Sequence, residues 1–181
     1  ISASTTYGVD PHTTIVRFST TDFTNNATET NFAACDVANV IPTLDDYLFP
    51  SQLEIFGTFN GIKEYNEHIY LVPYDINVCI RVLKSSFVSG TTTTLTASDI
   101  SSVDIGSLKH YSGVVVDSSN SYYSPLFSGS VIRINNDDFT TSGKSVLDLT
   151  TLNNVFTNFQ DIAQDEYNIY LVTNQNPSRL L

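Results

Sequence analysis

Residues 64–75 read EYNEHIYLVPYD, and residues 166–174 read EYNIYLVTN, so the chain contains nearly the same phrase twice. The similarity extends upstream, where a Phe-x-x-Phe pair occupies residues 56–59 and again residues 156–159. The run Ile-Tyr-Leu-Val is typical of a β-strand, because β-branched and aromatic residues suit a pleated sheet. A long phrase that recurs at a fixed offset indicates a protein built from tandem structural units.

A second element recurs three times and consists of an arginine inside a short apolar strand. It occurs at residues 15–18, 79–82 and 131–134, and each time a phenylalanine follows the arginine by six residues. The three arginines and their phenylalanines are Arg17 with Phe23, Arg81 with Phe87, and Arg133 with Phe139. A constant offset in three places supports a genuine repeat of about 50 residues with insertions.

Each unit offers about four short strands, and this number suggests a fold. In the third unit we expect strands at residues 131–135, 145–149, 155–161 and 167–172, separated by turns rich in Asn, Asp, Gly and Ser. Four strands per 40–50 residues is the period of a β-propeller blade. The sequence therefore predicts an all-β protein of tandem four-stranded blade-like repeats, similar to a β-propeller.

The middle unit is the least clear of the three. We predict its Ile-Tyr-Leu-Val strand at Val114–Val116 and its Phe-x-x-Phe equivalent at residues 100–103. Residues 98–108 have apolar spacing that would allow one helical turn, but β-branched residues argue against a longer helix. In this frame Tyr122 and Tyr123 fall outside the repeat.

The predicted organisation is an N-terminal arm followed by three repeats. The arm covers residues 1–14, repeat 1 covers 15–78 with an insertion at 33–50, repeat 2 covers 79–130, and repeat 3 covers 131–181. Closed propellers use about four to eight blades. Three units are therefore either an incomplete propeller or one completed by oligomerisation. The chain begins with Ile and has no Met, so we expect a processed chain or a piece of a longer one.

The third repeat resembles one unit of a tandem-repeat family in extracellular proteins of algae and other protists, whose units end in a YLVPY-type strand. Residues 69–74 read IYLVPY. The other matching residues are Arg133, Asp138, Phe139, Leu147, Asp148, Leu149, Thr150, Phe156, Phe159, Tyr170, Leu171 and Val172. The second unit matches poorly. The resemblance implies propeller blades or open β-repeat arrays in surface and filament proteins, with an architectural or adhesive role.

The charge of the chain excludes several partners. It carries 19 acidic and 8 basic residues, a net charge of −11. Nucleic acids and anionic membranes are recognised by Lys and Arg, so neither is expected here. No apolar run approaches the ~20 residues that span a bilayer. We expect no bound cofactor, although calcium suits an acidic surface, and the sequence does not identify metal ligands.

Several features favour a secreted protein. The chain is poor in Lys, rich in Ser, Thr and Asn, and carries one glycosylation sequon at Asn26. Cys35 and Cys79 are the two cysteines. They are either two buried free thiols or one disulfide, which would contribute roughly 3–4 kcal/mol by closing its loop.

The repeated arginines and the Tyr pair are candidate functional residues. An arginine in the middle of a buried strand needs a partner, because an unpaired buried charge is costly. We predict that Arg17, Arg81 and Arg133 form clamps between strands or blades, and an anion-binding ring of arginines is the alternative. Tyr122 and Tyr123 are the predicted contact surface for sugars, on which aromatic rings stack; packing in the core is the alternative.

The predicted function is a non-catalytic structural subunit of an extracellular assembly, such as a cell-surface coat or filament. We expect the chain to form homo-oligomers or polymers. The alternatives are a carbohydrate-binding or adhesion module, and a virion-like or pilus-like subunit that uses strand donation. No nucleophile motif or zinc-ligand spacing is present, so we predict no enzyme. A glycosidase-type propeller stays open, because its acids would lie on separate blades.

Overall fold

The structure is a computed structural model that describes residues 14–18, 32–37, 59–108, 110–151 and 158–173. These residues form strands and two short 3₁₀ segments. The strands are β1 (Thr14–Phe18), β2 (Phe32–Asp36), β3 (Phe59–Tyr65), β4 (His68–Pro73), β5 (Val78–Leu83), β6 (Thr92–Thr94), β7 (Ile100–Asp104), β8 (Tyr111–Val116), β9 (Asn120–Pro125), β10 (Ser130–Asn135), β11 (Lys144–Asp148), β12 (Phe159–Gln164) and β13 (Ile169–Thr173). The 3₁₀ segments are η3 (Lys84–Ser86) and η4 (Leu149–Thr151).

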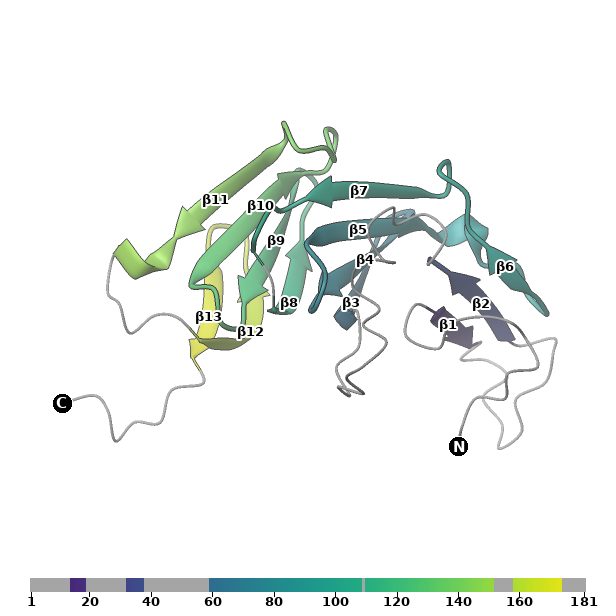
Figure 1. The fold of residues 1–181 in the computed structure, drawn as a ribbon, viewed down its shortest axis with the longest axis horizontal. Coiled ribbons are helices and arrows are strands. Elements are labelled where there is room, and N and C mark those ends of the chain that lie inside the picture. Colours follow the sequence, from purple (N-terminus) through teal and green to yellow (C-terminus); the bar gives the residue numbers. More distant parts are fainter. Residues whose placement is uncertain (1–13, 19–31, 38–58, 109, 152–157, 174–181) are drawn as a thin grey trace.

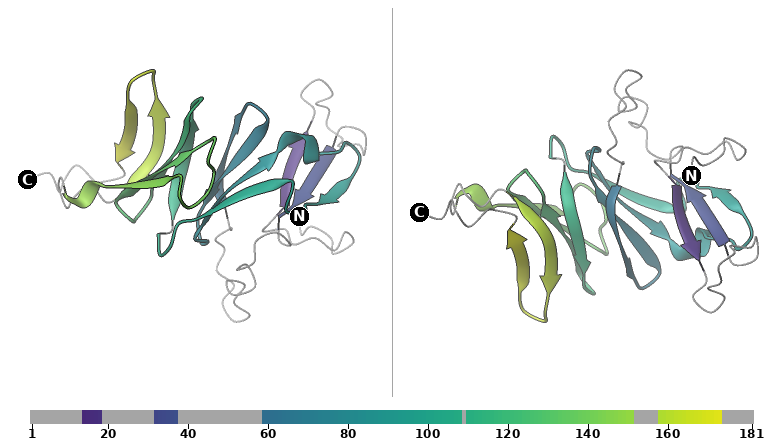
Figure 2. Two further views of the ribbon diagram at one scale, coloured as in Figure 1. Left: turned by 90° about the horizontal axis from the view of Figure 1, so that it is seen from above. Right: turned by 90° about the horizontal axis from the view of Figure 1, so that it is seen from below.

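The strands form four sheets that lie in series along the molecule (Figures 1 and 2). Sheet 1 has the order β1-β2-β6, sheet 2 has β3-β4-β5-β7, sheet 3 has β8-β9-β10-β11, and sheet 4 has β12-β13. Sheets 2 and 3 are four-stranded antiparallel meanders. In Figure 1 the first strands β3, β8 and β12 lie on the lower side of an arch, and β7 and β11 lie along its upper side. The predicted all-β fold with four-stranded, blade-like sheets is confirmed.

The phase of the repeat differs from the prediction. Sheet 2 runs from residue 59 to 104 and sheet 3 from 111 to 148, so both cross the predicted boundaries after residues 78 and 130. Each blade begins with an inner strand, which is β3 in sheet 2 and β8 in sheet 3. The second strand, β4 or β9, holds the repeated tyrosine and is called the Tyr strand. The third strand, β5 or β10, holds the repeated arginine and is called the Arg strand. The predicted repeat boundaries therefore fall between the second and third strands of a blade, and not between two blades.

The middle blade was assigned wrongly for the same reason. Val114–Val116 belong to β8, the inner strand, and not to the Tyr strand. Residues 100–103 belong to β7, the outer strand of sheet 2, and form no helical turn. The Tyr strand of sheet 3 is β9, where Tyr122 pairs with Arg133 as Tyr70 pairs with Arg81 in sheet 2.

In the described residues, sheets 1 and 4 each contain half of a blade. Sheet 1 contributes the Arg strand β1 and the strand β2 that follows it, and β6 adds in parallel beside β2. Sheet 4 contributes an inner strand and a Tyr strand. The predicted insertion at residues 33–50 thus begins within a strand of the repeat. Residues 1–13, which hold most of the predicted arm, and Asn26 lie outside the described residues.

Two apolar clusters cover the two faces of sheet 2. Alternation along β4 divides its side chains, because successive residues point to opposite faces. Tyr70 and Val72 join the cluster shared with sheet 3, whereas Leu71 joins the cluster shared with sheet 1. Each such side chain contributes about 1.5–3 kcal/mol when it is fully buried. The stacking of one blade on the next therefore forms the core.

The two cysteines lie in different clusters and are not bonded. Cys79 packs between sheets 2 and 3, and Cys35 packs between sheets 1 and 2. Both are buried free thiols, and the Cys35 thiol donates to the carbonyl of Ser86 at 3.4 Å. Of the two alternatives that the sequence left open, the structure has the free thiols and not the disulfide, because the β-alternation points the two side chains into separate cores. Burial raises the pKa of Cys35 to about 11 and raises that of Cys79 further, so both stay protonated at neutral pH.

Candidate functional site

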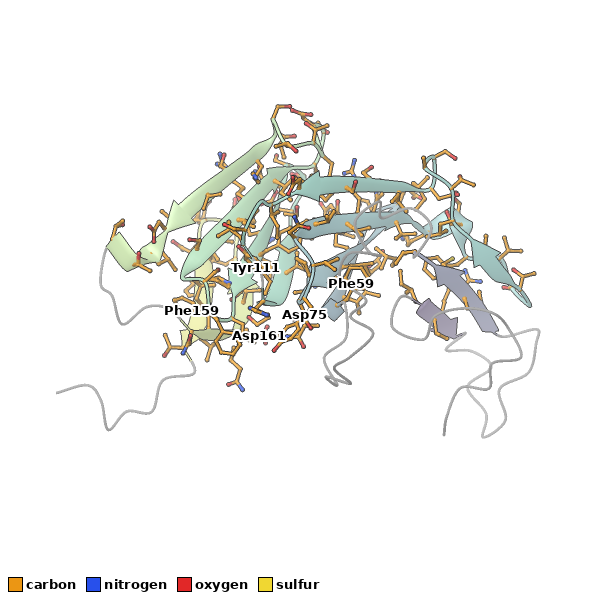
Figure 3. The ribbon with its side chains drawn as sticks, viewed as in Figure 1. Phe59, Asp75, Tyr111, Phe159 and Asp161 are labelled. Atoms are coloured by element: carbon orange, nitrogen blue, oxygen red, sulfur yellow. The ribbon has the colours of Figure 1, made fainter. Side chains whose placement is uncertain are left out.

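The three inner strands begin in the same way. Each starts with an aromatic residue, namely Phe59, Tyr111 or Phe159, and a register shift follows directly after it. A β-bulge of this kind bends a strand and turns the side chains next to it. Figure 3 shows the three aromatic residues along the lower side of the arch, together with Asp75 and Asp161. The starts of the inner strands thus form one edge of the sheets, which we call the mouth.

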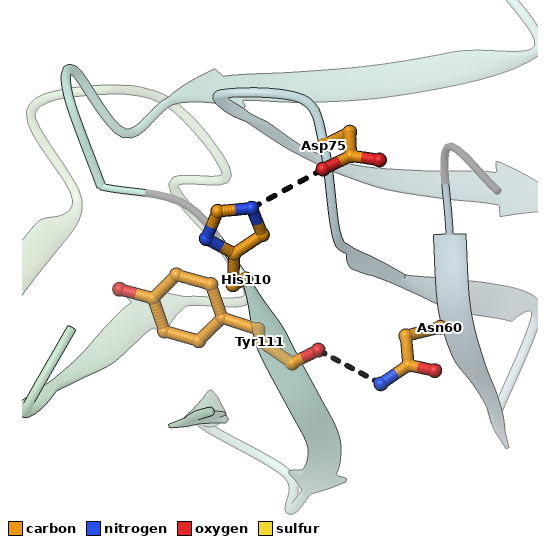
Figure 4. A network of polar contacts seen from close by, with 4 residues as sticks. All are labelled: Asn60, Asp75, His110 and Tyr111. Atoms are coloured by element: carbon orange, nitrogen blue, oxygen red, sulfur yellow. Dashed lines mark hydrogen bonds and ion pairs between the residues drawn. The ribbon is translucent and has the colours of Figure 1, made fainter. Parts of the chain in front are cut away.

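The inner strands approach one another closely at this edge. A Cβ atom on Gly113 would lie 3.0 Å from Cγ2 of Ile162 and 3.1 Å from Oδ1 of Asp161, both on the neighbouring sheet 4. Across the preceding junction, Nδ2 of Asn60 donates to the carbonyl oxygen of Tyr111 at 3.3 Å (Figure 4). Glycine is therefore used where backbones of adjacent blades must come close.

His110 stands at the mouth between sheets 2 and 3. Its φ angle is 61°, in the left-handed region that few residues other than glycine adopt. Its backbone N–H donates to the carbonyl of Tyr74 at 2.8 Å, and its carbonyl accepts from the N–H of Leu126 at 2.7 Å. Leu126 follows β9 and Tyr74 follows β4. His110 therefore ties together two loops that leave neighbouring sheets.

The imidazole of His110 is held by three side chains. Its Nε2 lies 3.2 Å from Oδ1 of Asp75 (Figure 4). The rings of Tyr74 and Phe127 meet it edge-on, with centroids 5.0 and 5.8 Å away. Asp75 and His110 are about half-exposed, and Phe127 is exposed. The imidazole is thus surrounded by one carboxylate and two aromatic rings.

At the opposite edge, two hairpin turns border an open groove of about 520 Å³. The turns are residues 117–120 of sheet 3 and 164–166 of sheet 4. Oδ1 of Asp117 accepts from the N–H groups of Ser119 and Asn120. Carboxylates in such turns stabilise the local backbone.

Asp165 lies in the second turn and makes the same local contacts. It accepts from the hydroxyl of Tyr170 at 2.6 Å and from the backbone N–H groups of Tyr167 and Asn168, which lower its pKa to about 2.

Among the described residues, no group of three or more His, Cys, Asp or Glu side chains could hold a metal ion. In the same part of the chain, no helix has the length and apolar character that crossing a membrane requires.

The three repeated arginines make different contacts. Nη1 of Arg81 donates at 2.7 Å to the carbonyl of Asn136, in the turn between β10 and β11 of sheet 3, and its guanidinium lies 4.5 Å from the ring centroid of Phe139. Nη2 of Arg17 donates to Oγ of Ser89 at 2.8 Å, in the loop between η3 and β6.

Arg133 instead donates to Ser145 on the next strand of its own sheet, at 3.2 Å. Of the three guanidinium groups, that of Arg81 thus links neighbouring sheets, and all three hydrogen bonds go to neutral oxygens. The three groups do not converge on one point, so the described contacts give no support to a ring that binds an anion.

The predicted Tyr pair is a poor contact surface. Tyr123 is fully buried between sheets 2 and 3, and burial raises the pKa of its hydroxyl. Tyr122 is partly buried on the other face of β9. Sequence reasoning missed the exposed aromatic residue of this region, Phe127, and the His110–Asp75 pair. No local motif marks that pair, because the fold brings the two residues together from different sheets.

Comparisons with known proteins leave the family open. No family model and no curated protein matches the chain. Among solved structures there is a similarity to the crystal structure of Myxococcus xanthus glutaminyl cyclase, with 14% sequence identity and a TM-score of 0.44. It covers 66% of this chain and 52% of that chain, so the chain spans about half the length of that enzyme.

Proposed function

We propose that the chain is a non-catalytic structural subunit of an extracellular assembly, such as a surface coat or filament. The observation that carries this proposal is a difference in burial between equivalent residues. Tyr70 and Val72 of β4 are 2% and 1% exposed, whereas Tyr170 and Val172 of β13 are 51% and 58% exposed. The same side chains are covered where another blade follows and uncovered where none is described.

The same contrast recurs at two further positions. Val103 on the outer strand of sheet 2 is 0% exposed, and Leu147 at the same place in sheet 3 is 59% exposed. Ile162 in sheet 4 is 7% exposed, and Ile62 in sheet 2 is 59% exposed. Contiguous apolar surface and open strand edges mark sites of association. Both ends of the array therefore support assembly with further blades.

The location outside the cell is supported by composition and by the resemblance to extracellular repeats. A net charge of −11 and the scarcity of Lys suit a secreted protein. The cysteines neither add to this argument nor oppose it, because two buried free thiols need no oxidising compartment.

Light scattering coupled to size-exclusion chromatography tests the proposal. We expect particles larger than the 20.0 kDa chain, and negative-stain images should show regular assemblies. A monodisperse monomer at micromolar concentration would contradict the proposal. A variant with Tyr170→Asp and Val172→Asp should dissociate the particles. Tyr167→Asp is the matched control, since Tyr167 is 82% exposed but belongs to the turn between β12 and β13.

Glycan binding at the mouth is the second candidate function. Phe127 offers an exposed ring beside His110 and Asp75, which could donate to and accept from sugar hydroxyls. Pockets that combine an apolar surface with a few oriented polar groups are typical ligand sites. A glycan array would test this. Retention that Phe127→Ala abolishes and Val88→Ala preserves would favour it, because Val88 is exposed to a similar extent on a different loop.

A further inference from the structure

β1 and β13 are complementary halves of one blade. β13 is a Tyr strand that pairs with β12 on one side, and in the described residues its other edge has no strand beside it. β1 is an Arg strand that pairs with β2, and its other edge is likewise open in that part of the chain. In sheets 2 and 3 the Tyr strand pairs with the Arg strand along these same edges.

The complete blades give the register of such a pairing. In sheet 2, Tyr70 is opposite Arg81 and Leu71 is opposite Ile80. Transferring this register places Tyr170 opposite Arg17 and Leu171 opposite Val16. Residues directly opposite each other in an antiparallel pair share a face. Exposed Val16 would then extend the apolar face that Leu171 begins.

Within the described residues, pairing β13 of a chain with β1 of the same chain would give too few blades to close a ring. Sheets 2 and 3 are two complete blades, and sheets 1 and 4 together contribute one more. Closed propellers have about four to eight blades. Counted over the described strands, one chain would give three blades, which is too few, and three chains would give nine, which is too many. Two chains give six.

We propose that β13 of one copy pairs with β1 of a second copy, and that two such contacts close a six-bladed ring from two chains. Each shared blade then has the order β12 and β13 from one copy followed by β1, β2 and the additional strand β6 from the other. This pairing rests on the proposed self-assembly and names its partner and its contact. It continues the packing between sheets 2 and 3, because each shared blade stacks on sheet 2 of the second copy.

That stacking accounts for the exposed residues at both ends of the array. Tyr170 takes the place that Tyr70 has in sheet 2, and Ile62 of the second copy takes the place that Val114 has in sheet 3. Tyr70 and Val114 are both buried in the cluster between sheets 2 and 3. Ile15, two residues before Arg17 on β1, already packs against the cluster shared with sheet 2, and Arg81 contacts Asn136 beyond β10 of sheet 3.

Cysteine cross-linking between two single variants tests the register. Val16→Cys and Leu171→Cys should form a disulfide when mixed under mild oxidation, since opposite residues have Cβ atoms about 4.5–5.5 Å apart. The product should run at twice the mass of the 20.0 kDa chain. The control is Val88→Cys mixed with Leu171→Cys. The native thiols of Cys35 and Cys79 are buried, so we expect them to take no part in the cross-link. Neither the control nor either variant alone should give this product.

The mass of the unmodified protein provides the second measurement. We expect two chains per particle or per repeating unit, and a dissociation constant that falls with added salt, because two chains of charge −11 repel each other. A monomer whose Val16→Cys, Leu171→Cys double variant cross-links within one chain would overturn the proposal, since the edges would then be covered internally.

The outcomes separate the contact from the function. Large assemblies without the predicted cross-link would leave the structural role standing and reject this contact. A cross-linked, discrete two-chain ring that builds nothing larger would confirm the contact and reject the coat or filament role. If either variant fails to fold, the mass of the unmodified protein decides, because a monomer rejects the shared blade.

Discussion

The junction between sheets 2 and 3 and the open face of sheets 3 and 4 use the same repeated residues with opposite results. At the junction, Tyr70 packs edge-on against Phe139, with ring centroids 6.0 Å apart, and Arg81 lies over the same ring. At the open face, Tyr170 bonds to its own turn through Asp165, and Arg133 bonds to its own sheet. Each repeat therefore encodes half of an interface, and the neighbouring blade determines whether that half is buried.

Truncating the repeated tyrosine should give the largest difference in free energy of unfolding between the junction and the open face. Tyr70→Ala should lower the free energy of unfolding by about 3–5 kcal/mol, because it empties a large buried site. Tyr170→Ala should cost less than about 1 kcal/mol in dilute protein, where its ring faces solvent. Urea unfolding followed by circular dichroism measures both. Equal costs in dilute monomer would show that β13 is already covered.

The repeated isoleucine of the inner strands should give the next largest difference. Ile162→Ala removes a side chain buried against sheet 3 and should cost about 2–4 kcal/mol. Ile62→Ala should cost less than about 1 kcal/mol, since Ile62 is exposed. The same unfolding experiment applies. A large cost at Ile62 that grows with protein concentration would indicate burial by a second copy.

The arginines allow a comparison that tests a polar contact. Arg81→Met keeps an apolar stem but removes the hydrogen bond to Asn136 and the charge over Phe139, so we expect a loss of about 1.5–3 kcal/mol. Arg133→Met should change stability by no more than about 0.5 kcal/mol, because its bond to Ser145 is exposed. Thermal unfolding of both variants checks this, and similar losses would contradict the inter-sheet clamp.

The smallest expected effect is a pH dependence at the open face. The hydroxyl of Tyr170 is the main cause of the lowered pKa of Asp165, about 2 against an ordinary value near 3.8. A lowered pKa stabilises the fold above the ordinary value, and this contribution is lost as the pH falls from about 4 to about 2. Tyr170→Phe should raise the pKa of Asp165, which carboxyl carbon NMR measures. An unchanged pKa would mean that the bond is absent in solution.

Much of the fold could be predicted from periodicity. The strands expected at residues 131–135 and 145–149 match β10 and β11 within one residue, because apolar runs bounded by Asn, Asp and Gly turns are local signals. The third expected strand, 155–161, overlaps β12 only in part. The phase of the blade was not predictable in this way, since a repeating sequence has no marked beginning.

The candidate site was predicted poorly for a different reason. Asp75 and His110 lie 35 positions apart and meet because one follows β4 and the other precedes β8. Tyr123 looked available for contact as a sequence, but pairing with β10 turns it into the core. A sequence shows that side chains alternate between the two faces of a strand, but it does not show which face the neighbouring sheet will cover.

The sequence by itself determined that this protein is a tandem array of short strands with a strongly acidic composition, because strand propensity, turn residues and charge are local properties. Tertiary structure decided how the strands divide into blades, which thiols and rings are buried, and where His110 meets Asp75. It also decided that the two ends of the array differ from its middle. The reason is that burial of a side chain depends on the sheet packed against it, and the sequence of one repeat does not determine whether such a sheet is present.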